Sequence, residues 1–182
     1  MNLVLKETSK EEDVRLIAAI NGWVLVAEYP NVNNTPHQIQ WNYNLDTFIV
    51  FVEDFLLELN YLVIEGLDME IVKNHVINGL EIYSEEDVLG INSEALDDSE
   101  VGNLIKVACL IAPRKFDEGF FKIFLKAFNS KSIDVQRVAV FAVNYVPWIQ
   151  FREILLKCKN DNPEISIDID VVVQANDSHG WL

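Results

Sequence analysis

The stretch that decides the fold is Ser132-Ile-Asp-Val-Gln-Arg-Val-Ala-Val-Phe-Ala-Val143. Its apolar residues recur at positions i, i+3, i+4 and i+7, which places them on one stripe of an α-helix. Ser132 or Asp134 can cap this helix by accepting a hydrogen bond from an amide of the first turn. Small alanines in the stripe let a neighbouring helix approach closely, so the stretch predicts a helix packed on other helices. The stripe consists of Val135, Val138, Ala139 and Ala142.

Similar openings occur 34 residues earlier, at Val101, and 30 residues later, at Ile165. A fainter copy starts near Val72. Second helices are expected between the openings, and prolines mark the junctions because proline ends one helix and suits the start of the next. The chain from about residue 70 therefore predicts repeated helix pairs. The second helices span residues 116–128 and 148–159, and the prolines are Pro113 and Pro147.

The openings Ile133-Asp-Val-Gln-Arg-Val-Ala139 and Asn162-Pro-Glu-Ile165 resemble HEAT repeats, in which an Asp- or Pro-led turn precedes a Val-X-Arg-X-Ala helix. The resemblance covers roughly residues 98–176, and only the copy at 134–142 has the arginine and both alanines. It implies a short α-solenoid that offers a surface for binding proteins rather than a reaction.

Residues 163–175 also fit a second pattern. Ile165, Ile167, Ile169 and Val171 alternate with polar residues, as in a half-exposed strand. The repeat register favours a helix, and the strand stays open as the alternative.

The N-terminal half predicts one helix followed by a small sheet. In the helix, residues 9–21, Ser9 and Glu12 have the spacing of a capping box. Four segments rich in β-branched and aromatic residues then predict an antiparallel meander. One rival is a single helix from Asp46 to Leu59. The four segments are residues 23–29, 38–43, 47–52 and 56–64.

The expected fold class is therefore α+β, with the N-terminal sheet packed on the C-terminal helical repeats. Residues 1–68 form the helix and meander, residues 69–182 form the helical-repeat part, and the two are expected to make one compact unit because a small sheet must cover its apolar face.

The charge is strongly negative and unevenly distributed. The chain of 182 residues carries 29 acidic and 14 basic residues, a formal net charge of −15. Residues 1–100 hold 20 of the acids and 4 of the bases. Direct binding to nucleic acid is not expected, because it requires clustered Lys and Arg. A confined negative field instead attracts a basic partner and speeds its encounter.

We therefore predict a non-enzymatic module that binds a basic protein. A specific form is an immunity or antitoxin-like inhibitor of a nucleic-acid-cleaving toxin, whose basic cleft a small acidic protein can fill. The alternative interpretation of the acidic stretch is a solvated face that only keeps the protein soluble. The predicted partner-binding residues are Glu81, Glu85, Glu86, Asp87, Glu94, Asp97, Asp98 and Glu100.

Catalytic and metal motifs are weak. The three histidines, His37, His75 and His179, have no second His or Cys at metal-ligand spacing. No phosphate loop, Gly-X-Gly-X-X-Gly or Gly-X-Ser-X-Gly occurs. We expect no cofactor and no metal. One alternative is an enzymatic or small-ligand site between sheet and helices that uses Glu53 or Asp54 with His37, and another is a scaffold in a larger assembly.

The compartment follows from the remaining features. Cys109 and Cys158 lie in apolar segments without metal spacing and are expected to be reduced core thiols. The start, MNLVLKETSKEED, lacks the pattern of a signal peptide, and no apolar run is long enough to span a bilayer. A cytoplasmic protein with no membrane contact is the expectation.

Overall fold

The computed structural model describes residues 1–32, 35–92 and 95–182. The chain divides into two compact units, Met1–Ser84 and Glu85–Leu182. This boundary lies 16 residues after the one predicted from the sequence, between residues 68 and 69. Helix α2 (Met69–Ile77) belongs to the first unit, because Val72 and Val76 are fully buried in the core that covers the sheet.

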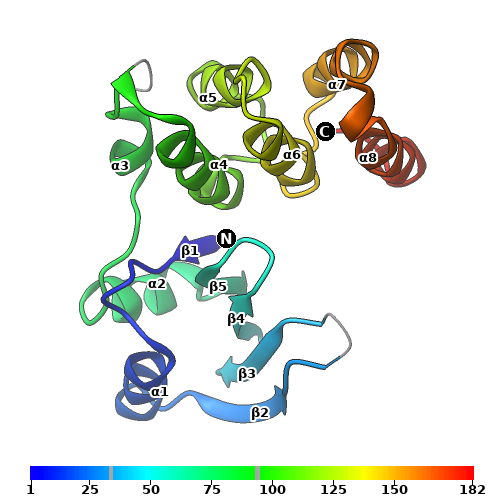
Figure 1. Cartoon of the computed structure of the whole chain (residues 1–182). Coiled ribbons are helices and arrows are strands. Elements are labelled where there is room, and N and C mark those ends of the chain that lie inside the picture. The colour runs from blue at the N-terminus through cyan, green and yellow to red at the C-terminus, as the bar shows by residue number, and fades with distance from the viewer. Residues whose placement is uncertain (33–34, 93–94) are drawn as a thin grey trace. The chain divides into compact units, whose positions relative to one another are not determined.

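The first unit contains a five-stranded antiparallel sheet with the strand order β1-β5-β4-β3-β2 (Figure 1). The predicted meander is present as its last four strands. Its first strand, β1, was not predicted; it has three residues and pairs with β5 through Leu3 and Leu62. The strands are β1 (Asn2–Val4), β2 (Val24–Tyr29), β3 (His37–Tyr43), β4 (Thr47–Asp54) and β5 (Leu59–Gly66).

Strand β4 settles the choice between strand and helix for residues 46–59 in favour of strands. Thr47 to Glu53 pair in register with β3, and Thr47 to Asp54 pair in register with β5. Ile49 and Phe51 point to the covered face and are buried, whereas Phe48 before them is exposed and Val50 between them is half-buried. This period of two is what a strand requires.

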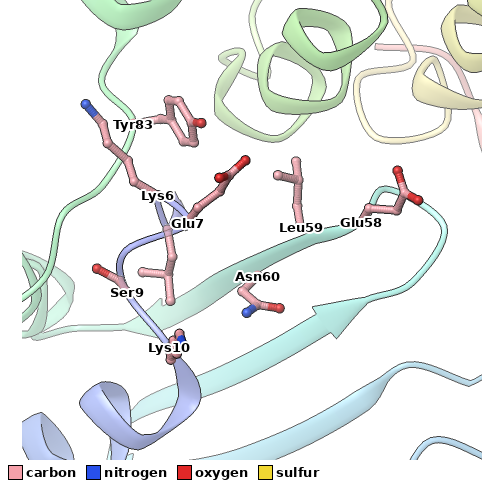
Figure 2. Close-up of a pocket in the computed structure, with 9 residues that line it drawn as sticks. Lys6, Glu7, Ser9, Lys10, Glu58, Leu59, Asn60 and Tyr83 are labelled. Carbon is pink, nitrogen blue, oxygen red and sulfur yellow. The ribbon is translucent and has the colours of Figure 1, made fainter. Parts of the chain in front are cut away.

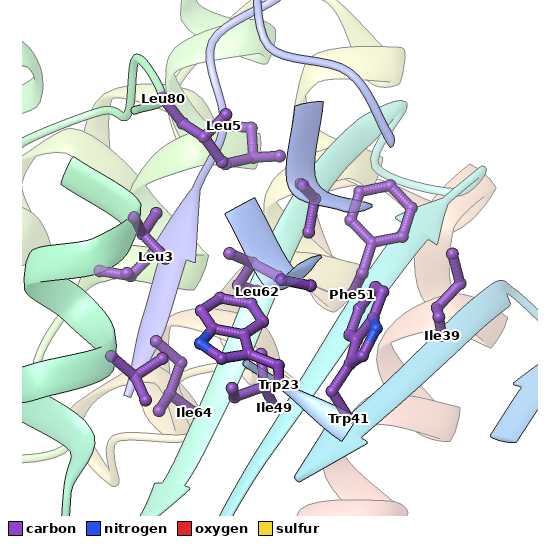
Figure 3. Packing of buried hydrophobic residues seen from close by; sticks show 14 residues of the cluster. Leu3, Leu5, Trp23, Ile39, Trp41, Ile49, Phe51, Leu62, Ile64 and Leu80 are labelled. Atoms are coloured by element: carbon purple, nitrogen blue, oxygen red, sulfur yellow. The ribbon is translucent and has the colours of Figure 1, made fainter. Parts of the chain in front are cut away.

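Helices α1 (Glu11–Ile20) and α2 pack on the sheet and bury its apolar side chains. The cap of α1 differs from the prediction. The N-cap residue is Lys10 and not Ser9. The backbone N–H of Lys10 donates to the carboxylate of Asp13, which takes the place predicted for Glu12. Ser9 instead bonds to the backbone of Glu81, so its hydroxyl holds a neighbouring segment. Figure 3 shows the resulting core, with Trp23 and Trp41 packed edge to face.

The second unit is helical, and Figure 1 shows α4, α6 and α8 in one row with α5 and α7 in another. The helices begin close to the openings that the repeat pattern marked. A 3-10 helix, Pro163–Ile165, leads into the last one. The helices are α3 (Glu85–Leu89), α4 (Asp98–Ile111), α5 (Glu118–Phe128), α6 (Ile133–Ala142), α7 (Gln150–Asp161) and α8 (Ser166–His179).

Residues 163–175 are helical, as the repeat register favoured. Ile165, Ile169 and Val172 are fully buried on one stripe, whereas Ile167 is 77% exposed and Val171 is 57% exposed. The alternation of β-branched residues therefore reflects apolar side chains on two faces of a helix rather than a strand.

Aromatic rings join α5 and α7, the two helices of the second row. Phe124 of α5 and Phe151 of α7 have ring centroids 4.8 Å apart, and Trp148 stacks on Phe151 at 5.6 Å. The indole N–H of Trp148 donates to the carbonyl of Arg114 at 3.0 Å, which satisfies its polar atom. Trp148 is thus a core residue at the junction that Pro147 marks.

Candidate functional site

The predicted partner-binding carboxylates are divided between the two units. Glu81 belongs to the first unit, and Glu85, Glu86, Asp87, Asp97, Asp98 and Glu100 belong to the second. Glu94 lies outside the described residues. In the second unit these carboxylates lie on α3 and on the first turn of α4, and the two helices are in contact.

Glu85 and Glu86 occupy the first turn of α3, and both are exposed. Among the described residues neither carboxylate has a hydrogen-bond or ion-pair partner. Asp87 follows them, is half-buried and takes part in an interaction with its surroundings. The exposed pair at the start of α3 therefore presents its charge directly to solvent.

The start of α4 uses its acids as caps. The carboxylate of Asp97 accepts from the backbone N–H of Glu100 at 2.9 Å, and the carboxylate of Glu100 accepts from the N–H of Asp97 at 2.8 Å. This reciprocal capping box satisfies two amides that the first turn leaves free. Asp98 accepts from the hydroxyl of Ser130 at 2.5 Å.

Glu81 also has an internal partner, since its carboxylate accepts from the hydroxyl of Thr8 at 2.8 Å. The donors to Glu81, Asp97, Asp98 and Glu100 are all neutral N–H or O–H groups. These bonds order the four carboxylates without neutralising them, and no ion pair with a cation of the described residues does so.

Acidic residues later in the chain behave differently. Asp168 lies 2.9 Å from the guanidinium of Arg137, Asp177 lies 2.9 Å from Arg152, and Glu118 lies 2.8 Å from Lys122. Arg152 donates through both Nε and an Nη atom to Asp177. These hydrogen bonds and one from the Trp181 indole lower the pKa of Asp177 from 3.8 to about 2. Carboxylates neutralised by cations are therefore found on α5 and α8.

The alternative site brings His37 together with three glutamates. Its Nδ1 atom lies 3.5 Å from carboxylate oxygens of Glu11 and Glu53, and its Nε2 atom lies 3.5 Å from Glu28. Arg15 bonds to Glu11 at 2.6 Å and to Glu28 at 2.9 Å. The Arg15 hydrogen bond, assisted by His37, lowers the pKa of Glu28. The group links α1 to strands β2, β3 and β4.

Asp54 does not join this group. Adjacent strand residues point to opposite faces, so only Glu53 shares a face with His37, its partner across the ladder. Asp54 is 3% exposed, and one of its oxygens accepts from the N–H groups of Leu56 at 2.9 Å and Leu57 at 3.0 Å. It therefore stabilises the β4–β5 turn. Glu53 remains largely exposed, with 59% of its side chain accessible.

A cavity of about 370 Å³ lies at this turn and is lined in part by Glu53, Asp54 and Glu58. His37 is not part of its lining. The geometry thus separates the histidine from the buried carboxylate that the enzymatic alternative needs beside it.

A second cavity of about 330 Å³ was not anticipated from the sequence (Figure 2). Its wall combines the cations of Lys6 and Lys10 with the anions of Glu7 and Glu58. The ammonium of Lys6 lies 5.5 Å from the ring centre of Tyr83. Because both signs of charge are present, the wall does not select an anion or a cation.

The described part of the chain contains no cluster of three or more His, Cys, Asp or Glu side chains arranged to hold a metal ion. Of the helices in residues 1–32, 35–92 and 95–182, none combines the length and hydrophobicity that crossing a membrane requires. Comparison with known proteins finds no family model, no curated protein and no solved structure that matches this chain.

Proposed function

We propose that this protein is a non-enzymatic binding module that recognises a basic protein through the carboxylates of α3 and the first turn of α4. Five of these carboxylates form what we call the α3–α4 acidic surface: Glu85, Glu86, Asp97, Asp98 and Glu100. Glu81, Asp87 and Glu94 belong to the same acidic stretch of sequence.

The observation that carries the proposal is the absence of cationic partners for these five carboxylates within the described residues. Between residues 85 and 100 the sequence has seven acids and no Lys or Arg. Residues 101–182 carry 9 acids and 10 bases and pair many of them. A negative field concentrated at one end of a helical unit steers a positively charged partner more effectively than dispersed charge does.

The ordering of the α4 carboxylates also supports a binding role. The capping box fixes Asp97 and Glu100, and the bond to Ser130 fixes Asp98. Side chains that are already ordered lose less conformational entropy when a Lys or Arg of a partner docks against them. Stacked helix pairs of the HEAT-like kind would supply a rigid frame for this surface.

The specific form that we favour is an immunity or antitoxin-like inhibitor acting in the cytoplasm. A nucleic-acid-cleaving toxin has a basic cleft, and the carboxylates of the α3–α4 acidic surface would occupy the phosphate positions of that cleft.

The test is affinity capture of partners from the host cell with three immobilised proteins: the wild type, a Glu85→Lys/Glu86→Lys variant and a Glu153→Lys/Glu164→Lys variant. The last is a matched control, because Glu153 and Glu164 are exposed and also lie in first helical turns. Both variants therefore change the net charge equally and impose a similar helix-dipole cost.

We expect one basic protein to bind the wild type and the control, to elute as NaCl rises, and to be lost from the α3 variant. In kinetic measurements with the purified partner, the α3 variant should slow association by about tenfold at low salt, with a smaller change in dissociation. Equal capture on all three proteins, or an affinity that does not change with salt, would refute the proposal.

A further inference from the structure

The sheet of the first unit has two edges that differ in how they are covered. At the β1 edge, residues 81–83 continue the hydrogen bonding: Tyr83 N–H donates to Val4 at 2.8 Å and Lys6 N–H donates to Glu81 at 2.9 Å. Strand β2 forms the opposite edge. Among the described residues no strand pairs with its outer side.

The side chains of β2 are apolar and exposed to an unusual degree. Val24 is 66% exposed, and Leu25 and Val26 are 53% and 55% exposed. Helix α1, which leads into β2, adds Leu16 and Ile20, at 58% and 69%. Exposed edge strands normally carry charges that prevent pairing with another chain, and the segment 16–27 carries none.

Helix α1 lies over the β2 side of the sheet. Arg15 reaches Glu28 of β2 at 2.9 Å, and the N–H of Trp23 donates to the carbonyl of Ala18 at 2.9 Å. Figure 1 shows α1 beside the start of β2. Leu25, opposite the buried Trp41, points to the face that α1 covers, whereas Val24, opposite Asn42, points to the other face. The edge strand and α1 therefore both present uncharged apolar side chains to solvent.

We propose that a second copy of this chain covers the edge strand and α1, with the β2 strands of the two copies pairing antiparallel about a two-fold axis. Such pairing makes one continuous sheet and places both helical layers on the same face. The two α1 helices then lie side by side across the axis, where Leu16 and Ile20 of each copy lose their contact with water. Strand and helix are covered by the same symmetry operation.

Charge favours a second copy over the basic partner proposed above. A basic protein would meet no carboxylate between residues 16 and 27. With the axis at Ala27 and the bulge residue Val26 left unpaired, Glu28 of each copy lies opposite Leu25 of the other, so the two carboxylates do not face each other. Glu28 is also neutralised within its own copy by Arg15.

The β-bulge between Leu25 and Ala27 limits the length of the pairing. Each copy also carries a net charge of −15, so the copies repel at long range. The dimer is therefore expected to be reversible and to strengthen as salt rises, because the Debye length falls from about 10 Å at 0.1 M to about 3 Å at 1 M. Binding to a basic partner has the opposite salt dependence.

The experiment is sedimentation equilibrium of the full chain over a range of protein and NaCl concentrations. Val26→Lys tests the strand and Ile20→Lys tests the helix. The control is Leu67→Lys, since Leu67 is 84% exposed and lies in the turn between β5 and α2. All four proteins carry nearly the same charge, and circular dichroism checks that each is folded.

We expect the wild type and Leu67→Lys to form dimers whose dissociation constant falls as NaCl rises, and each of the other variants to weaken the dimer at least about tenfold. A protein that is monomeric under all conditions refutes the proposal, as it would leave β2 to a different kind of partner. A dimer that Val26→Lys and Ile20→Lys leave intact refutes it as well.

Discussion

Arg137 of α6 donates to the carboxylate of Asp168 on α8 at 2.9 Å, and so joins two neighbouring helices of the same row. The arginine is the residue that distinguishes the opening at 134–142 from the next one, which has aspartates instead. The two openings differ in sequence because one supplies the cation and the other the anion of this pair.

Removal of this pair should lower stability modestly. Replacing Asp168→Asn should reduce the free energy of unfolding by up to about 1 kcal/mol, since the pair is partly exposed and screened by solvent. Asp134→Asn is the control, because Asp134 is 93% exposed and lies 3.6 Å from the same guanidinium. Urea denaturation measures both. A larger loss for Asp134→Asn would contradict the assignment of Asp168 as the main partner.

The Arg152–Asp177 pair predicts a pH dependence. Because the pKa of Asp177 is lowered from 3.8 to about 2, the carboxylate stabilises the folded chain when ionised. This stabilisation is complete above pH 4 and is lost as pH falls through about 2. The difference in melting temperature between the wild type and Asp177→Asn should therefore shrink from about pH 4 to about pH 2. A constant difference over that interval would contradict the prediction.

Two glycines should respond differently to alanine. Gly66 ends β5 with φ +129°, and a Cβ there would lie 1.9 Å from the backbone oxygen of Asp46. Gly66→Ala should therefore cost about 3 kcal/mol or more, because backbone must move. Gly22→Ala should cost only about 1–2 kcal/mol, because Gly22 has φ +70° but no atom lies within 4 Å of its Cβ position. Equal losses of unfolding free energy in urea denaturation would show that the backbone conformation of the two glycines, and not the contact with Asp46, determines both losses.

Two carboxylates of the α3–α4 acidic surface should separate stability from binding. Asp97→Ala removes the N-cap of α4 and should lower the free energy of unfolding by about 1 kcal/mol. Glu86→Ala removes an exposed charge without a described partner and should change stability by less than about 0.5 kcal/mol. If Glu86→Ala destabilised the protein as strongly as Asp97→Ala, the negative charge at the start of α3 would have a structural role instead.

The local sequence pattern was sufficient to predict a helix or strand where one of its faces is buried against a neighbouring element. The stripe of Val135, Ala139 and Ala142 predicted α6, and the aromatic and β-branched density of residues 47–52 predicted β4. The same reasoning could not find β1, because a three-residue strand has no recognisable period. It exists through its partner, β5, and through residues 81–83 on its other side.

Position in the sequence was also insufficient to predict which side chains of the candidate sites come together. Glu53 and Asp54 are adjacent, yet the strand sends them to opposite faces, and only Glu53 meets His37. Likewise, the acids of residues 81–100 look uniform in the sequence. The structure distinguishes capping residues such as Asp97 and Glu100 from Glu85 and Glu86, which have no described partner.

By itself, the amino-acid sequence determined the longer helices and strands and the charge: periodicity follows from the spacing of apolar residues, and net charge from composition. Tertiary structure alone decided which carboxylates are neutralised, which edge of the sheet is open and which residues close the β1 side. These features depend on contacts between segments far apart in the chain, and such contacts form only when the cores of the two units are packed.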